Sequence, residues 1–225
     1  MRRTLLALAL ALAVSGAHAR DDTESGRDIS HVNGGITAEA GQRYGDLETV
    51  NGGISVREGA IAGDVETVNG GITLDDDVQV NSAATVNGGV SAGERVKVAR
   101  GAETVNGGIR FGFNSRIGGD LATVNGGITV SQTEVGGQVR TVGGDITIGA
   151  RSMVHGGILV EKPGKLGFKW GKQRIPRIVI GPNATINGSL RFEREVELFV
   201  HTSAKIGSVR GASARAYTDT LPARR

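Results

Sequence analysis

One short motif recurs seven times at nearly constant spacing, and it constrains the fold of this 225-residue chain more than any other feature. The motif reads Thr-Val-Asn-Gly-Gly-Ile in most copies, begins at Val32 and ends with the variant TVGGDIT at Thr141. Such a constant period is typical of a solenoid, in which each coil stacks on the previous one and equivalent side chains superpose. Successive asparagines are 18 or 19 residues apart, and Gly143 continues the period: Asn33, Asn51, Asn69, Asn87, Asn106 and Asn125.

The residues between the motifs favour short strands. They contain β-branched alternations such as Ile54-Ser55-Val56, punctuated by Gly and Asp, and lack the apolar stripes of helices. Eighteen residues divide into three sides of about six residues, with coils stacked about 4.8 Å apart. The sequence therefore predicts an all-β fold, a single-stranded parallel β-helix with a triangular section and coils of about 18 residues. Its handedness stays open.

The motif itself has a structural interpretation that needs no ligand. We expect the Gly-Gly pair to supply a corner with positive φ, which β-branched residues cannot adopt. We expect the asparagine before it to stack its amide on the asparagine of the next coil, as in other polar ladders. The six asparagines are thus predicted to form a structural corner ladder.

An antiparallel meander is the alternative, because Asn-Gly between apolar residues is also a strong hairpin signal. A meander would need a second, comparable turn in the middle of every unit. Those middles are dissimilar, for example Arg57-Glu58-Gly59 and Asp75-Asp76-Asp77. The constant spacing therefore favours the solenoid.

Glycine accounts for 37 of the 225 residues, over twice the usual frequency of about 7 %. Glycine and the 4 prolines together stay below the roughly 25–30 % that indicates low-complexity disorder. Apolar residues make up 38 %, but Phe, Trp and Tyr number only 5, 1 and 2. The predicted core is therefore narrow and built from Val, Ile, Leu and Ala.

The chain divides into three regions. Residues 1–19 have the order of a signal peptide, with Arg2 and Arg3, an apolar run and then Ala17-His18-Ala19. The apolar run is too short to span a bilayer, which disfavours the alternative of a retained anchor. Residues 20–209 form the predicted β-helix, with an insertion over 161–177, and residues 210–225 a flexible tail. We expect an exported protein, in the periplasm, at the cell surface or secreted.

Charge is distributed unevenly along the chain. Residues 20–149 carry 10 basic and 18 acidic side chains, whereas residues 150–225 carry 14 and 5. An acidic body beside a basic end favours head-to-tail contacts between copies, a geometry that makes filaments when it does not close. The nearly neutral predicted mature chain and its export argue against a nucleic-acid partner.

The insertion holds the candidate binding residues. It surrounds aromatic side chains with cations and contains no acid between residues 162 and 177. This combination suits an anionic, partly apolar surface such as lipid head groups, or another copy of the chain. In the alternative interpretation the aromatics fold back onto the solenoid and the lysines are merely solvated. The candidates are Lys162, Lys165, Phe168, Lys169, Trp170, Lys172, Arg174 and Arg177.

No other pattern indicates chemistry. His31, His155 and His201 lack the paired spacing of a metal site, and His155 resembles the asparagine of a corner. The run Asp75-Asp76-Asp77 could bind Ca²⁺ but lacks the nonapeptide period of calcium-binding β-rolls, so a solvated corner is the simpler interpretation. No nucleophile with a nearby base and no phosphate-binding loop is found. We predict no catalytic residues, metal or cofactor.

The tandem TVNGGIT units resemble bacterial adhesin-like repeats, a family named for a fold rather than a tested activity. The segment IVIGPNATINGSL, from Ile178 to Leu190, is similar to the coils of bactofilins. The latter resemblance implies a narrow, polymer-forming β-helix at the bacterial envelope, although the signal peptide departs from the usual cytosolic bactofilin. The same segment is also similar to hexapeptide-repeat acyltransferases.

We therefore predict a non-enzymatic structural or interaction protein of the bacterial cell envelope. It would be a rigid rod that binds or self-assembles through its ends, a face or the basic loop. The main alternative is a carbohydrate-active lyase or hydrolase built on a β-helix, which would need a groove with paired carboxylates. An acyltransferase is a further alternative and would require a trimer and an acyl cofactor.

Overall fold

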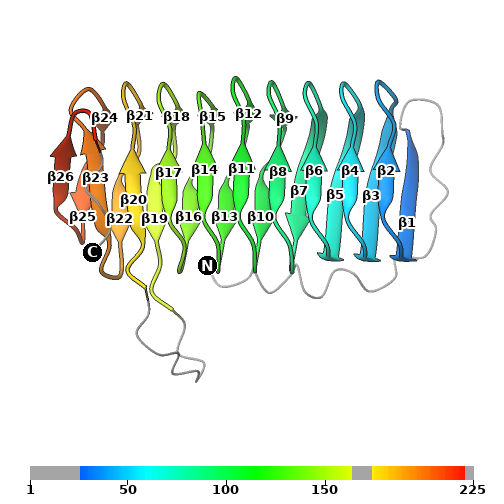
Figure 1. Cartoon of the computed structure of the whole chain (residues 1–225), viewed down its shortest axis with the longest axis horizontal. Coiled ribbons are helices and arrows are strands. Elements are labelled where there is room, and N and C mark those ends of the chain that lie inside the picture. The colour runs from blue at the N-terminus through cyan, green and yellow to red at the C-terminus, as the bar shows by residue number, and fades with distance from the viewer. Residues whose placement is uncertain (1–25, 164–173, 221–225) are drawn as a thin grey trace.

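The computed structural model describes residues 26–163 and 174–220 and shows a parallel β-solenoid. The coils stack along one straight axis, from β1 at one end to β26 at the other (Figure 1). The ten strands of one sheet mark ten turns, and neighbouring strands in that sheet are 18 or 19 residues apart before the insertion. The solenoid prediction is confirmed, and the antiparallel meander is wrong, because the strand pairs are parallel. None of the described residues belongs to a helix that could cross a membrane.

Each turn has three faces. Face 1 is the ten-stranded sheet: β2 (Ile36–Ala38), β4 (Ile54–Val56), β6 (Ile72–Leu74), β8 (Val90–Ala92), β11 (Ile109–Phe111), β14 (Ile128–Val130), β17 (Ile146–Ile148), β20 (Arg177–Ile180), β23 (Glu197–His201) and β26 (Ala214–Tyr217). Face 2 holds β9 (Lys97–Val98), β12 (Arg116–Ile117), β15 (Glu134–Val135), β18 (Met153–Val154), β21 (Thr185–Ile186) and β24 (Lys205–Ile206).

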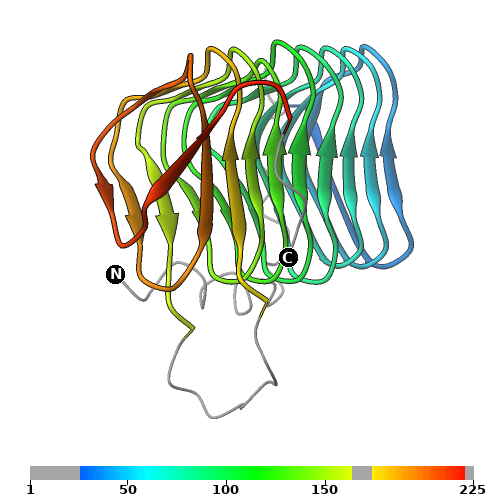
Figure 2. The ribbon, with the colours of Figure 1, turned by 60° about the vertical axis from the view of Figure 1, so that its left-hand side comes forward.

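Face 3 follows face 2 in the chain. It holds β10 (Ala102–Thr104), β13 (Leu121–Thr123), β16 (Val139–Thr141), β19 (Ile158–Val160), β22 (Leu190–Phe192) and β25 (Val209–Arg210). The early coils add β1 (Arg27–Asn33) and β3 (Tyr44–Asn51) to face 3, whereas β5 (Ile61–Asn69) and β7 (Gln79–Thr85) run through faces 2 and 3 without a break. Figure 2 shows the strands of successive coils side by side. We call the corner between faces 3 and 1 corner 1, that between faces 1 and 2 corner 2, and that between faces 2 and 3 corner 3.

The interior is one continuous stack of small apolar side chains. On face 1, Ile54 lies between Ile36 and Ile72 in register, and all three are buried. Phe111 and Phe192 are the phenylalanines buried in this interior among the described residues. Because a parallel stack superposes equivalent positions about 4.8 Å apart, each inward row needs side chains of similar size. This requirement explains the low aromatic content of the chain.

A buried threonine precedes each corner of the motif after the first copy, which has His31 at that position. Thr67 is 2 % exposed, and its Oγ1 donates to the carbonyl oxygen of Gly52 in the previous coil at 2.8 Å. Thr85 repeats the bond to Gly70 at 2.8 Å, and Thr104 to Gly88 at 2.7 Å. A buried hydroxyl is costly unless it is hydrogen-bonded, so this bond explains why a polar residue is tolerated inside the core.

The Gly-Gly pair serves a different purpose from the one predicted. Among the glycines of the repeated motif, only Gly34 has a positive φ, of 115°, so the prediction of a positive-φ Gly-Gly corner is wrong for the later motif copies. A Cβ on the first glycine would instead meet backbone: on Gly70 it would lie 2.0 Å from the Gly52 carbonyl oxygen. The carbonyl that accepts the threonine bond thus fills the space that any side chain would need. The motif requires glycine for close approach between coils.

The left-handed conformations occur at corner 2 instead. Gly41 and Gly59 have φ values of 66° and 68°, and equivalent positions of later coils hold non-glycine residues with φ between 46° and 59°. Asn tolerates this region best among L-residues, but Arg and Gln also occur in the row. These positions are Asp77, Arg95, Asn114, Gln132, Arg151 and Asn183. Corner 2 is therefore uniform in backbone although variable in sequence.

The insertion leaves from corner 1 between β19 and β20. The register resumes after it, since Ile178 pairs with Ile146 across face 1. His155 does not occupy the asparagine position of corner 1, contrary to the sequence prediction. It lies at corner 3, between β18 and β19, where Gly156 stacks on Gly137. The similarity of His-Gly-Gly to Asn-Gly-Gly reflects a shared demand for small residues at two different corners.

The solenoid continues beyond residue 209, where the sequence analysis placed a flexible tail. Residues 214–217 form β26, which pairs with β23. Tyr217 packs edge-on against His201, and its hydroxyl donates to the carbonyl oxygen of Ile180 at 3.1 Å. Main-chain pairing needs no apolar period, so this last strand could not be predicted from the residue pattern.

Candidate functional site

The predicted binding loop is described only at its base. Lys162 lies on the outgoing side and Arg174 and Arg177 on the returning side, beside corner 1 of the eighth coil. The other candidates fall outside the described residues: Lys165, Phe168, Lys169, Trp170 and Lys172.

Asp145 holds the returning side of the loop against the solenoid. Its Oδ2 pairs with Nη2 of Arg174 at 3.1 Å, and its Oδ1 accepts the backbone N–H of Arg177 at 2.8 Å. Arg194, one coil further on, donates to the carbonyl oxygens of Val142 at 2.9 Å and Arg174 at 3.3 Å. Asp145 takes the second glycine position of the motif in TVGGDIT, so this departure from the repeat supplies the anchor. These contacts fix the point at which the chain rejoins the sheet.

The Arg177 side chain packs against an aromatic ring of the next coil. Its guanidinium lies 4.5 Å from the ring centroid of Phe199, and that of Arg215 lies 5.9 Å from the same ring on the other side. Phe199 follows Val179 in the outward row of face 1, so it lies outside the solenoid interior and is covered by these arginines. Cation–π contacts of this kind stabilise an aromatic ring that is not in the core. Arg174 and Arg177 thus support the base of the loop, and Lys162 is exposed at its start.

The asparagines of corner 1 form one row. Nδ2 of each donates to Oδ1 of the asparagine in the previous coil, at 3.0 Å for Asn51 to Asn33 and 2.9 Å for Asn69 to Asn51. The same bond at 2.9 Å joins Asn87 to Asn69, Asn106 to Asn87 and Asn125 to Asn106. The row leaves each inner amide with one bond given and one accepted, which accounts for the recurrence of asparagine.

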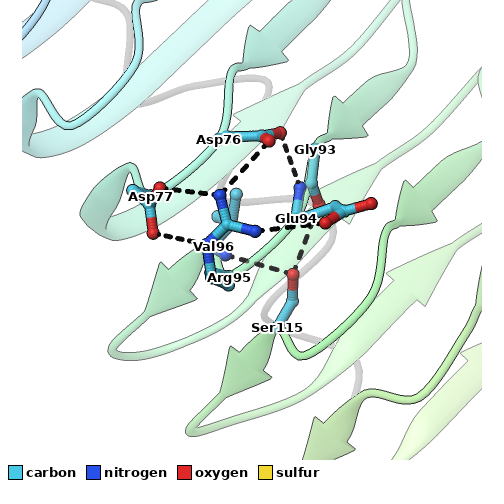
Figure 3. Close-up of polar contacts among 7 residues, drawn as sticks. All are labelled: Asp76, Asp77, Gly93, Glu94, Arg95, Val96 and Ser115. Atoms are coloured by element: carbon cyan, nitrogen blue, oxygen red, sulfur yellow. Dashed lines mark hydrogen bonds and ion pairs between the residues drawn. The ribbon is translucent and has the colours of Figure 1, made fainter.

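The aspartates of the Asp75–Asp77 run at corner 2 pair with arginines, and Figure 3 shows the contacts of Asp76 and Asp77 with Arg95. The Arg95 guanidinium donates to both carboxylate oxygens of Asp77 at 2.8 Å and to Glu94 at 3.1 Å. Asp76 Oδ1 accepts the backbone N–H of Glu94 at 2.9 Å. The hydrogen bond from Arg95 lowers the pKa of the Asp77 carboxyl and raises that of the guanidinium. The Asp77 carboxylate is therefore paired with a cation of the next coil, and Asp75 with Arg57 of the previous one.

The three described histidines lie apart, and His155 and His201 have local partners. Nε2 of His155 lies 3.2 Å from Oε1 of Glu134, and Nδ1 lies 3.2 Å from Nδ2 of Asn187. The hydrogen bond from Arg116 and then that from His155 lower the pKa of Glu134. His201 contacts Ser203 and the carbonyl oxygen of Thr218, and His31 is exposed on β1. Within the described residues, no group of His, Asp and Glu has the arrangement of a metal site.

An open groove crosses face 3 at corner 3, a feature that the sequence analysis did not identify. Its floor is made by Ala83, Ala84 and nearby glycines, and its walls carry both signs of charge. Asp64 pairs with Arg100, and Nη2 of Arg140 lies 3.6 Å from both Glu103 and Asp120. The charged residues of the groove wall are Asp64, Glu66, Arg100, Glu103 and Asp120.

Acids accumulate on face 3 beyond the groove, towards the first coil. Burial raises the pKa of Glu66, and the nearby Glu48, Asp64 and Asp46 raise it further. Burial and the neighbouring aspartates raise the pKa of Glu48 in the same way. The residue before each motif threonine lies at the centre of face 3, so reading that one position through all repeats would have revealed this patch.

Comparison of the chain with protein-family models, with characterised proteins and with solved structures finds no significant match. The resemblances to adhesin-like repeats and bactofilins therefore rest on the repeat and on the β-solenoid fold.

Proposed function

We propose that this protein is a non-enzymatic structural or interaction protein of the bacterial cell envelope, exported as a rigid β-helical rod. The observation that carries the proposal is the ten-turn stack, whose coils, apart from the insertion between β19 and β20, consist almost entirely of strands and tight corners. Such a stack offers long, regular surfaces and little loop material for an enclosed reaction site.

The two ends support assembly. Within the described residues, β1 and β2 each pair on one side only, as do β24, β25 and β26 at the other end. Unpaired parallel strand edges are templates for further pairing. A head-to-tail contact between rods would continue both sheets, and because it does not close it would build filaments.

The basic loop is the proposed contact with an anionic envelope surface. Asp145 fixes its returning side, and the sequence contains no acid from Lys162 to Arg177. Lysine attraction to anionic lipid is worth about 1 kcal/mol per residue near the surface. Three lysines would therefore contribute about two orders of magnitude in binding.

Vesicle binding tests this loop. Replacing Lys165, Lys169 and Lys172 by Glu should abolish co-sedimentation with vesicles of anionic phospholipid, which the unmodified protein should show at low salt. The matched control replaces Arg43, Lys97 and Lys205 by Glu, three exposed cations of the coils, and should bind as before. Equal binding by both variants would remove the loop from the proposed function.

A β-helix carbohydrate-active enzyme is the second candidate, and the groove on face 3 is the observation that favours it. Glu66 and Glu103 lie two coils apart across Ala84, a backbone spacing of about 9.6 Å. Both side chains line the groove, as the two carboxyl groups of an inverting glycosidase line its cleft, where they are about 6.5–9.5 Å apart. Turnover of acidic and neutral polysaccharides that is lost in Glu66→Gln and Glu103→Gln would establish this candidate, and turnover at the blank level would end it.

A further inference from the structure

The central outward position of face 3 forms a column whose charge reverses along the rod. The strand register places acidic residues in the second, third and fifth coils and arginines in the seventh, ninth and tenth. At the same position, the fourth, sixth and eighth coils carry small or apolar side chains. In coil order the column reads Ser30, Glu48, Glu66, Ala84, Glu103, Ala122, Arg140, Leu159, Arg191 and Arg210.

Several of these charges are poorly compensated within the chain. Among the described residues, Glu48, Glu66 and Arg210 take part in no ion pair of their own chain. Arg140 reaches across Ala122 towards Glu103, but at 3.6 Å the contact is too long for a good hydrogen bond. Arg191 pairs with Glu193 next to it. The glutamates of the acidic half therefore repel one another, and the arginines of the basic half have N–H groups that can donate to further acceptors.

The column is complementary to its own reverse. If a second rod is turned end for end about a twofold axis at Ala122, coil two faces coil ten, coil three faces coil nine, and so on. Glu48 then lies opposite Arg210, Glu66 opposite Arg191 and Glu103 opposite Arg140. Every charged position meets the opposite charge, and the twofold axis forms each of these pairs twice.

The apolar positions fit the same arrangement. Ala84 faces Leu159, so the partly exposed leucine of one copy meets the alanine floor of the groove in the other. Ala122 faces itself on the axis, where its short side chain allows close approach. The coil rise is identical in the two copies, so the match is kept along the whole face.

The competing arrangements are less favourable. Two rods packed parallel through face 3 would place Glu48 on Glu48 and Arg210 on Arg210, and like charges directly opposite are destabilising. The paired face is about 38 Å long and about 16 Å wide, which is roughly 600 Å² per copy at the strand dimensions of β-sheets. This area is at the lower end of specific interfaces, so we expect a weak, salt-sensitive contact.

We propose that two copies of this chain pair side by side and antiparallel through face 3, with Glu48, Glu66 and Glu103 of each copy opposite Arg210, Arg191 and Arg140 of the other. This inference deepens the proposed assembly function, on which it rests, by naming a lateral partner and its surface. In such pairs the groove at Ala84 is covered.

Sedimentation velocity over a protein concentration series tests the pairing. The mature protein should form dimers at about 50 mM salt that dissociate at about 0.5 M salt. Two double variants test the charges. The first combines Glu48→Arg with Glu66→Arg, and the second combines Arg191→Glu with Arg210→Glu. Each places like charges opposite one another at four contacts of the dimer, because every substitution occurs once in each copy. Each double variant should weaken dimerisation at least about tenfold. Glu39→Arg with Glu58→Arg, the same charge change at exposed corner 2 positions, should dimerise like the unmodified protein.

Mixing the two double variants provides the rescue. An antiparallel pair of one with the other restores opposite charges at all four positions, so the mixture should dimerise although neither variant does so alone. Failure of the mixture to dimerise, or an unmodified protein that stays monomeric at low salt, overturns the lateral pairing. End-to-end filaments in electron micrographs and vesicle binding are separate readouts. A rod that keeps these without lateral pairs would refute this inference and leave the proposed function standing.

Discussion

The two glycines of each corner 1 pair have unequal roles. A Cβ on the first would overlap a carbonyl oxygen of the previous coil, whereas a Cβ on the second would lie farther from its nearest neighbour, at 2.8 Å on Gly89 and 3.4 Å on Gly71. The difference follows from the threonine hydrogen bond, because the carbonyl that accepts it points at the first glycine of the next coil. The seventh motif copy agrees with this division, since it keeps Gly144 and replaces the second glycine by Asp145.

Substituting each glycine of one pair by alanine should separate these roles. In Gly70→Ala the new Cβ would lie 2.0 Å from the Gly52 carbonyl oxygen, and the coils must move apart. We expect a loss of about 1–3 kcal/mol in the free energy of unfolding, the usual cost of overpacking. In Gly71→Ala the nearest atom lies at 3.4 Å, and the change should be neutral or slightly stabilising. Urea denaturation followed by circular dichroism measures both, and equal losses would contradict the steric explanation.

At the scale of the elements, carboxylates are paired with cations at corner 2 but lie beside other carboxylates on face 3. At corner 2 the Asp77 carboxylate is neutralised by Arg95 of the next coil. On face 3 the strands β3 and β5 place Glu48 beside Glu66 with like charge, and no cation of the chain pairs with either among the described residues. The first arrangement stabilises the ionised form and the second destabilises it.

Opposite pH dependences follow for the two sites. The raised pKa of Glu66 means that the folded state loses stability as pH rises from 4.5, the ordinary value, through the raised pKa. Glu66→Gln should therefore stabilise dilute monomer at pH 7 and have no such effect below pH 4.5.

The lowered pKa of Asp77 means that its contribution to the free energy of unfolding is present at neutral pH and is lost as pH falls through that pKa. Asp77→Asn should destabilise at pH 7 and approach the unmodified protein in acid, as thermal unfolding across pH would measure. The same sign for both variants would contradict these assignments.

At the scale of the whole molecule, the coil is the unit of construction. Each coil contacts chiefly its two neighbours, so the rod behaves as a one-dimensional array. The insertion after β19 shows that extra residues at a corner leave the stacking register intact. Length along the axis can thus change in whole coils, whereas a partial coil would move every later strand to a different face.

Deleting one whole coil tests this construction. Removal of residues 70–87 joins Asn69 to Gly88, restores the Asn-Gly-Gly corner and brings Asn106 next to Asn69 in the row. We expect a folded rod whose denaturant m-value falls by about a tenth, in proportion to the surface lost. The matched control removes residues 70–78, half a coil, and should lose the β-sheet signal in circular dichroism. A half-coil deletion that folds equally well would contradict the coil-by-coil register.

The sequence by itself determined the period, the parallel β-solenoid and the position of the asparagine row. These follow from the repeat because stacking forces equal positions into contact. It did not determine why the corner needs glycine, since the overlap at Gly70 involves a carbonyl oxygen one coil away. Nor could it place β26, whose pairing is made by the backbone and fixed by Tyr217. The charge column of face 3 was present in the repeat, but only the strand register across the insertion aligned Leu159 with Arg191 and gave the column its antiparallel complement.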